Sequence, residues 1–275
     1  MPDSLIDQAK QGDRGAFSRL VEAEFPKLRR ITRRLVGHPE DSEDILQEAL
    51  AKAWSNMSNF EGRSSFATWV TSIVTRTAID HLRRQKRWRT EAQVAYANSC
   101  AQSDELSNEV VGAITDPEFA YEVREHISYC FTCVGRSLPV DEQAALVLRD
   151  VMDLSAREAS TVLGISDAVL RHRLSAARRA MEDKYDGLCA LVSKRGICHQ
   201  CAGLKMASGE PADPADFPDV SVLAARMAIV RKAEPGSMAG LHAVFWRRTK
   251  DIEEAGKGST EPLSGCGEIE DAPET

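Results

Sequence analysis

The chain is poor in the features that mark membrane, fibrous and secreted proteins. Aromatic residues make up only 6% of its 275 residues. No apolar run approaches the roughly 20 residues that a membrane-spanning helix needs. The opening residues, MPDSLIDQAKQGD, lack the basic start and apolar centre of a secretory signal. With charged residues at 28%, the composition predicts a helix-rich cytoplasmic protein with no membrane partner, and the length favours two domains with an appended segment.

Positive charge is concentrated in one place, although the formal net charge is −7. One short segment contains five basic residues and no acid: Arg83, Arg84, Lys86, Arg87 and Arg89. Another contains five acids and no base: Glu40, Asp41, Glu43, Asp44 and Glu48. Local patches, more than the net charge, decide which partner a surface attracts. Two separate charged surfaces therefore predict two different partners.

The first 90 residues have the apolar spacing of a helical domain. Two helices are expected over residues 4–36, with a break at 11–13 and a stop at 37–39. Asp41 or Ser42 would cap a third helix, whose apolar residues lie on one side. Its exposed side would carry Asp44, Gln47 and Glu48.

A fourth helix, capped by Ser64 or Ser65, leads into the basic segment. Its apolar positions form one buried stripe that includes Trp69. The opposite side carries the polar residues Thr68, Thr71, Ser72, Thr75, Arg76, Asp80 and Arg83. We therefore expect residues 1–90 to form one compact helical domain.

The pattern is lost over residues 91–116, which are small, polar and mildly acidic and predict a flexible linker. A second domain is expected over residues 117–187, with helices over 118–138, 139–152, 155–163 and 166–185. A short helix, a Gly-containing turn and a Ser-capped basic helix are typical of a helix-turn-helix. Ordinary helical hairpins share this pattern, so the motif alone does not decide the function.

Three stretches together now resemble one known family: DSEDILQEALAKAW, FEGRSSFATWVTSIVTRTAIDHLRR and LPVDEQAALVLRDVMDLSAREASTVLGISDAVLRHRLSAARRAM. In order, spacing and helix phase they resemble bacterial RNA polymerase sigma factors of the extracytoplasmic-function group. The resemblance covers residues 4 to about 187. It implies an all-α fold in which the first domain binds polymerase and melts the minus-ten promoter element. The second domain would bind the minus-thirty-five element.

The resemblance implies a surface for polymerase. Asp44, Gln47 and Glu48 match the family's D-x-x-Q-E face, which docks on the clamp of the polymerase beta-prime subunit. The second domain would contact the flap of the beta subunit, and an anti-sigma factor is a further implied partner. Exposed carboxylates attract a basic surface and set orientation, even when each contact adds little affinity. On charge alone, the same face would be an ordinary solvated surface.

The resemblance also implies where promoter DNA binds. In the first domain the DNA-facing residues are Arg76 and Asp80 for bases, with Arg83, Arg84, Lys86 and Arg87 for phosphates. In the helix-turn-helix they are Ser166, Asp167, Arg171, His172 and Arg173 for the major groove, with Arg149 and Arg178 for phosphates. Thr75-Arg76 stands where many relatives have Arg-Asn, and Val169 where they commonly have Thr. These departures leave the base preference open.

The final segment, residues 188–275, would be a partly disordered extension with helices over 220–232 and 241–252. Together with the second domain it holds two cysteine pairs of ligand-like spacing, Cys130 with Cys133 and Cys198 with Cys201. Four thiolates predict a zinc site, with Cys189 and His199 in reserve. A dithiol switch, an iron–sulfur cluster and plain burial of the thiols are the alternatives. No other cofactor is expected.

Two rival classes remain to be separated. A helix-turn-helix regulator that acts without polymerase would explain the second domain, but not the acidic face or the basic helix end of the first. An enzyme is not expected, because the nucleophile, P-loop and metalloprotease motifs are missing from the sequence. The extension is too poor in paired His, Asp and Glu residues for a self-contained active site.

Overall fold

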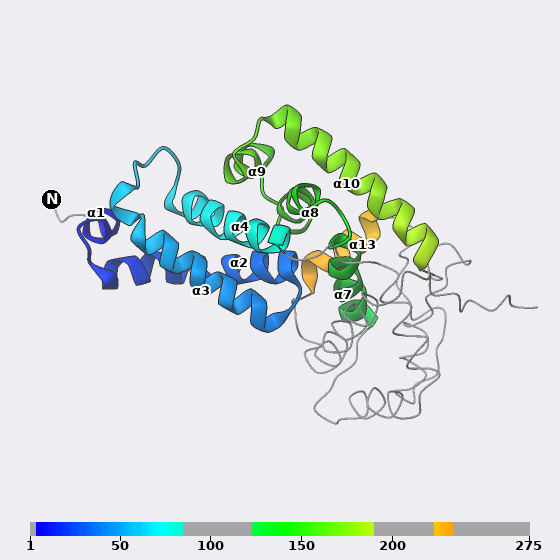
Figure 1. The fold of residues 1–275 in the computed structure, drawn as a ribbon, viewed down its shortest axis with the longest axis horizontal. Helices are drawn as coiled ribbons and strands as arrows, with labels where there is room; N and C mark the ends of the chain where they lie inside the picture. Colours follow the sequence, from blue (N-terminus) through cyan, green and yellow to red (C-terminus); the bar gives the residue numbers. More distant parts are fainter. Residues whose placement is uncertain (1–3, 85–122, 190–222, 234–275) are drawn as a thin grey trace, which may run out of the picture.

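The computed structural model describes residues 4–84, 123–189 and 223–233 (Figure 1). Every element in these ranges is helical, which confirms the predicted all-α class. The first range contains α1 (Leu5–Lys10), α2 (Arg14–Val36), α3 (Pro39–Ser55), the 3₁₀ turn η1 (Met57–Asn59) and α4 (Phe66–Arg84). The others contain α7 (Val123–Gly135), α8 (Val140–Leu146), η2 (Val147–Val151), α9 (Ala156–Leu163), α10 (Asp167–Leu188) and α13 (Leu223–Lys232). No helix in the described ranges is both long and apolar enough to cross a bilayer.

The N-terminal range forms a bundle in which α2, α3 and α4 pack against one another. Its own core contains buried Leu28, Leu46 and Val70, with aromatic rings at one end. Phe66 lies among these rings, 6.2 Å from Phe17 and 5.8 Å from Trp69 between ring centroids. The described part of this bundle ends at residue 84; the predicted domain boundary at 90 lies beyond the described range and stays a prediction.

The start of α3 differs from the sequence prediction. His38, and not Asp41 or Ser42, caps the helix: its Nδ1 accepts a bond from the Asp41 backbone N–H at 3.3 Å. Pro39 occupies the first turn, where its fixed φ suits a helix and its missing N–H costs nothing. Ser42 is buried, and its hydroxyl donates back to the carbonyls of His38 and Pro39.

Helix α4 is buried on more than the one stripe predicted for it. Its Ser65 cap is confirmed, because Ser65 Oγ accepts from the Thr68 N–H at 3.1 Å. However, Thr71 and Thr75, which were expected on the polar side, are 1% and 0% exposed. The reason is that α4 contacts α8 and α9 of the second range as well as α2 and α3. Sequence periodicity alone could not reveal this second neighbour.

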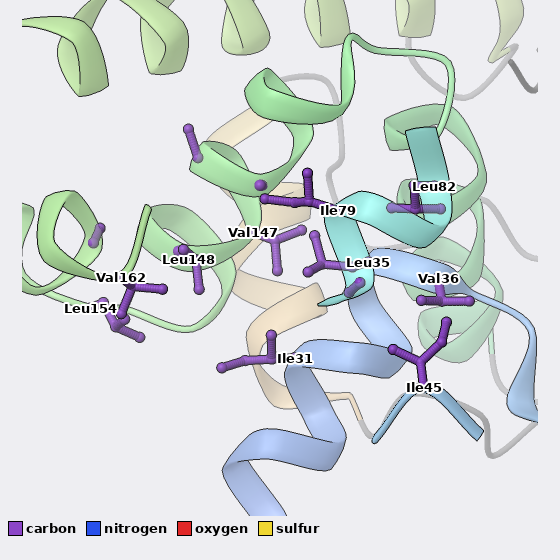
Figure 2. Close-up of a cluster of buried hydrophobic side chains, with 14 of the residues drawn as sticks. Ile31, Leu35, Val36, Ile45, Ile79, Leu82, Val147, Leu148, Leu154 and Val162 are labelled. Carbon is purple, nitrogen blue, oxygen red and sulfur yellow. The ribbon is translucent and has the colours of Figure 1, made fainter. Parts of the chain in front are cut away.

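Figure 2 shows the core that the two ranges share. Ile31 and Leu35 of α2 and Ile79 of α4 cluster with Val147 and Val162 from the second range. Buried hydrophobic surface of this kind is the main source of stability in a folded domain. The two domains therefore pack as one body in this arrangement.

The second range departs from prediction at one helix. The expected helix over 139–152 is α8 followed by a π-helical turn, η2, and the chain then passes through Asp153 at φ 56°. Wide turns of this type occur where extra residues are accommodated within a helix.

The predicted helix over 220–232 is confirmed as α13, which packs against α7, η2 and α10. The linker 91–116 and the predicted helix over 241–252 lie outside the described residues.

Candidate functional site

Helices α9 and α10 form the predicted helix-turn-helix. Ser155 and Glu158 make a capping box at the start of α9, and Gly164 ends the helix in the left-handed region at φ 66°. Ser166 then caps α10 by accepting from the Val169 N–H at 3.3 Å. The two helices are also joined by a bond from Ser160 Oγ to Asp167 at 2.5 Å. These local contacts fix the angle at which α10 leaves the turn.

The first turns of α10 present the residues predicted for the major groove. Ser166, Asp167, Arg171 and His172 are exposed there. Arg173 is half-buried, with its guanidinium 3.3 Å from a carboxylate oxygen of Asp141. The exposed side of α10 therefore carries donors at its N-terminal end, as a recognition helix requires.

Two arginines predicted for phosphates are held by partners within the chain. Arg178 makes a two-pronged ion pair with the buried Asp150, at 2.8 and 2.7 Å. This hydrogen bond is the main cause that raises the pKa of Arg178. Arg149 donates to the Leu154 carbonyl. Arg178 still exposes 49% of its side chain, so a phosphate could reach it, and the predicted role stays a prediction.

The acidic face of α3 has the predicted geometry. Asp44, Gln47 and Glu48 are all exposed, while Ile45 and Ala49 between them are buried. Glu48 pairs with Lys52 at 2.6 Å, and this bond is the main cause that lowers the pKa of Glu48. The face is therefore anionic at neutral pH.

Glu43, on the neighbouring side of α3, is held within the bundle. Burial would raise the pKa of Glu43, but bonds from Arg29 and Arg33 at 2.7 and 2.8 Å outweigh it and lower the pKa. This carboxylate ties α3 to α2 and is less available to a partner than the exposed acids of the same helix.

The basic end of α4 is exposed but meets the second domain. Arg76, Asp80, Arg83 and Arg84 are all exposed, whereas Lys86 and Arg87 lie outside the described residues. Arg83 binds both carboxylate oxygens of Asp141 on α8, at 3.1 and 3.3 Å. Asp141 thus lies between Arg83 of one domain and Arg173 of the other.

Arg76 lies directly against the helix-turn-helix. A Cβ placed on Gly164 would approach Arg76 Nη2 to 2.8 Å, which is closer than real Cβ contacts come. The residue predicted to face the separated DNA strand and the turn between the two DNA-binding helices are therefore in contact. The structure brings the two sets of predicted DNA-binding residues together at one place.

Comparisons with known proteins agree with this geometry. The family model for Sigma-70 region 2 matches residues 20–88, and the one for Sigma-70, region 4 matches residues 130–181. RNA polymerase sigma-H factor of Pseudomonas aeruginosa is 30% identical over 180 residues, covering 65% of this chain and 90% of that protein. The chain belongs to the extracytoplasmic-function sigma factors of the sigma-70 family.

Two further similarities are found. ECF RNA polymerase sigma factor SigW of Bacillus subtilis is 27% identical, covering 64% of this chain and 92% of that protein. The solved sigma factor RpoE from Bartonella quintana, in complex with the anti-sigma factor NepR, is 18% identical with a TM-score of 0.41. That alignment covers 61% of this chain and 94% of the solved one.

As a member of this family, the chain directs RNA polymerase to promoters and is not an enzyme. The family predicted from the sequence is thus confirmed. The rival interpretation, a regulator that acts without polymerase, has no account of the match to region 2. The alignment with sigma-H leaves over a third of the chain unmatched.

The described residues leave the cysteine hypothesis untested. Cys198 and Cys201 lie outside them, and the side chain of Cys133 is not described. Cys130 and Cys189 are free thiols, and within the described ranges no group of three or more His, Cys, Asp or Glu side chains could hold a metal. Zinc at the cysteine pairs therefore stays a prediction.

Sequence reasoning missed three functional arginines and one acid of this sigma factor. Arg34 is 1% exposed and Arg226 is 2% exposed, yet charged residues are almost never buried unless paired. Arg30 and Asp141 also bridge separate parts of the chain. A signal existed for Arg30 and Arg34: the run KLRRITRRL places basic residues on a helix face that is otherwise apolar.

Proposed function

We propose that this sigma factor binds core polymerase through the α3 face formed by Asp44, Gln47 and Glu48, which docks on the clamp of the beta-prime subunit. The single observation that supports this is the exposure of all three side chains on one side of a helix whose other side is buried. An anionic surface recruits a basic partner and fixes its orientation. The second domain would contact the beta flap. The anti-sigma factor stays a predicted partner, and the cytoplasm, where polymerase acts, the predicted location.

The sigma factor would then read promoter DNA with two surfaces. Arg76 and Asp80 would contact bases of the opened minus-ten strand, and the basic residues after them would bind its phosphates. The N-terminal end of α10, with Arg171 and His172, would enter the major groove of the minus-thirty-five element. Unstacking each base costs a few kcal/mol, which binding of the displaced bases would offset without ATP.

Run-off transcription tests this proposal. Core polymerase from the source bacterium, mixed with the full chain and a library of genomic promoter fragments, should yield discrete transcripts that polymerase alone does not make. Asp44→Lys should lower the affinity for core polymerase by about tenfold, because it places a like charge against a basic surface. Glu22→Lys, the same charge change at an exposed position of α2, is the matched control. Transcripts that do not depend on the chain would contradict the proposal.

We further propose that metal or redox chemistry at the cysteine pairs regulates this activity. The support is the spacing of Cys130 with Cys133 and of Cys198 with Cys201. Elemental analysis of the purified chain should find zinc, and chelator or peroxide should change run-off transcription. A variant carrying Cys198→Ser and Cys201→Ser should lose that response, whereas Cys100→Ser should keep it. An identical response from all three chains would exclude the idea.

A further inference from the structure

Helix α13 comes from the extension, yet it lies between the two domains of the sigma factor. Figure 1 shows it in orange beside α7, and it also contacts η2. Leu223, Met227 and Val230 of this helix are buried in a core that they share with α7, α8 and α10. One side of α13 is therefore part of the second domain's core.

The C-terminal end of α13 is held by the first domain. Arg34 of α2 is 1% exposed, and its Nη2 donates to the carbonyls of Val230 and Ala233 at 2.7 and 2.6 Å. Its Nη1 donates to Ser128 Oγ of α7. The neighbouring Arg30 donates to the Arg231 carbonyl. The Val230 and Arg231 carbonyls belong to the last turn of α13, and Ala233 follows that turn directly. Carbonyls at the end of a helix lack partners within it and carry the negative end of its dipole.

Two arginines of α13 complete the docking on the second domain. Arg231 donates to the Asp150 carbonyl and lies 3.9 Å from an Asp153 carboxylate oxygen. Arg226 is 2% exposed, stacks over the Tyr185 ring at 3.9 Å and bonds Cys189 Sγ at 3.1 Å. A buried charge is costly unless it is paired, so these contacts stabilise α13 in its docked position.

The docked arrangement places the second domain against the side of α4 that would bind the opened promoter strand. With the domains in contact, Arg76 lies on the helix-turn-helix turn and Arg83 is bound to Asp141. The C-terminal half of α4 is packed against α8 and α9. The side chains of Arg76 and Arg83 stay exposed, but a DNA strand laid along this side of α4 would meet α8 and α9 until the second domain moves away. The acidic face of α3, in contrast, stays exposed in the same arrangement.

We propose that α13 is an intramolecular clasp that holds the sigma factor closed. Its docking surface is formed by Arg30 and Arg34 of α2 and Ser128 of α7, and its occupant is residues 223–233 of the same chain. The clasp rests on the proposed DNA-binding function, because it holds α8 and α9 against the side of α4 that would bind the promoter strand. Polymerase could still be bound through α3 while the clasp is shut.

The length of α13 makes such a clasp reversible. The helix has ten residues, fewer than the roughly 12 that an isolated helix needs to be even marginally stable in water. Released from its site, it would lose its helical structure together with its contacts. Docking and helix formation are thus coupled, and a change that weakens a few contacts shifts the whole segment.

Val230→Asp is the sharpest test, because Val230 is 0% exposed in the clasp and belongs to neither family-matched domain. In the full chain without polymerase, small-angle scattering should show a larger radius of gyration than in the unchanged chain. Hydrogen exchange should become faster in α4 and α9. Binding of a fluorescent single-stranded DNA of about 20 nucleotides should tighten by about tenfold, because the binding-competent fraction rises.

Arg34→Met gives an independent second variant, since it removes the donors that join α2 to α13 and keeps an apolar stem. Arg29→Met is the matched control: Arg29 lies on the same helix but binds only Glu43 of its own domain. The two clasp variants should behave alike, and the control like the unchanged chain. Unaltered scattering and exchange in Val230→Asp, or opening without tighter DNA binding, would overturn the proposal. Because no readout uses polymerase, its failure is distinct from failure of run-off transcription.

Discussion

The two domains of this sigma factor are built on different kinds of core. The N-terminal bundle has a core of its own, and every aromatic pair in the described part of the chain lies in it. The second domain has a core that is completed by α13, which comes from the extension. Its apolar residues are divided between a cluster shared with α2 and α4 and a cluster completed by α13. The bundle's own core thus comes from one continuous segment, whereas the second domain's own core also needs a helix of the extension.

This difference bears on regulation. A domain that draws its core from its neighbours can be released only when those contacts break, and contacts between domains can have two arrangements. The bundle, with its aromatic core and its exposed α3 face, would keep its shape in either arrangement. The second domain would change its surroundings completely. The signal that reaches the sigma factor is therefore expected to act on the second domain and the extension.

The largest loss of stability should come from truncating a side chain in the N-terminal bundle's own core. Phe66→Ala removes a ring that is 8% exposed and lies 6.2 Å from Phe17. We expect a loss of about 3–5 kcal/mol in the free energy of unfolding of the bundle. Denaturant unfolding measures the total, and hydrogen exchange assigns it to residues 4–84.

A matching truncation in the core that the two domains share tests whether the two cores differ. Leu148→Ala, at a position that is 0% exposed, should cost about 2–5 kcal/mol and raise exchange in α4 as well as in α8 and α9. Phe66→Ala should leave α9 and α10 protected. Equal spread of the two changes across both domains would show that the cores are not different in kind.

A smaller effect is expected at the contact between Arg76 and the turn. Gly164→Ala places a Cβ at φ 66°, which costs about 1–2 kcal/mol, and also pushes Arg76 aside. Gly62→Ala meets nearly the same backbone strain at φ 73° but no neighbour within 4 Å. Both should lower stability, but only Gly164→Ala should speed exchange in α4. That difference should vanish in an Arg76→Ala background, as a double-mutant cycle would reveal.

Much of the bundle and the helix-turn-helix could be predicted from local pattern. Local sequence determines where these helices begin and end. Examples are the helix ends at Gly37 and Gly164 and the N-terminal caps at Ser65 and Ser166. The acidic face of α3 could be predicted from helical spacing, because residues three or four positions apart lie on the same side of a helix.

The contacts between domains could not be predicted in this way. Thr75 was expected on the polar side of α4 and is buried, because α8 and α9 cover that side. Arg34 could be read as a surface charge of α2, and its partners are carbonyls some two hundred residues further along the chain. Nothing in local spacing reports which segment will cover an exposed face. The wrong cap at α3 had a local cause: Pro39 was taken only as a stop.

The cap of α9 gives a prediction of about 1 kcal/mol. Ser155→Ala removes the side chain that accepts from the Glu158 N–H at 3.2 Å. The pKa of Glu158, which is lowered mainly by its bond to Ser155, should rise toward 4.5. Ser4→Ala breaks the same type of capping box in α1 but should cost less, because α1 buries only Ala9 whereas α9 buries three residues. NMR titration and thermal unfolding check both.

The smallest effect is on the pH dependence of stability, through a histidine of α4 near the core that the two domains share. His81 lies near the end of α4, and burial is the main cause that lowers the pKa of His81 below 6.5. The unfolded chain therefore takes up this proton at a higher pH than the folded one, and stability falls as the pH drops from about 6.5 toward the folded value. His81→Gln should flatten that decline by a few tenths of a kcal/mol, since solvent still reaches the ring. His172→Gln, at an exposed position of α10, is the control. Thermal unfolding between about pH 5 and 7 measures both, and equal slopes would mean that the end of α4 is more open than the closed arrangement allows.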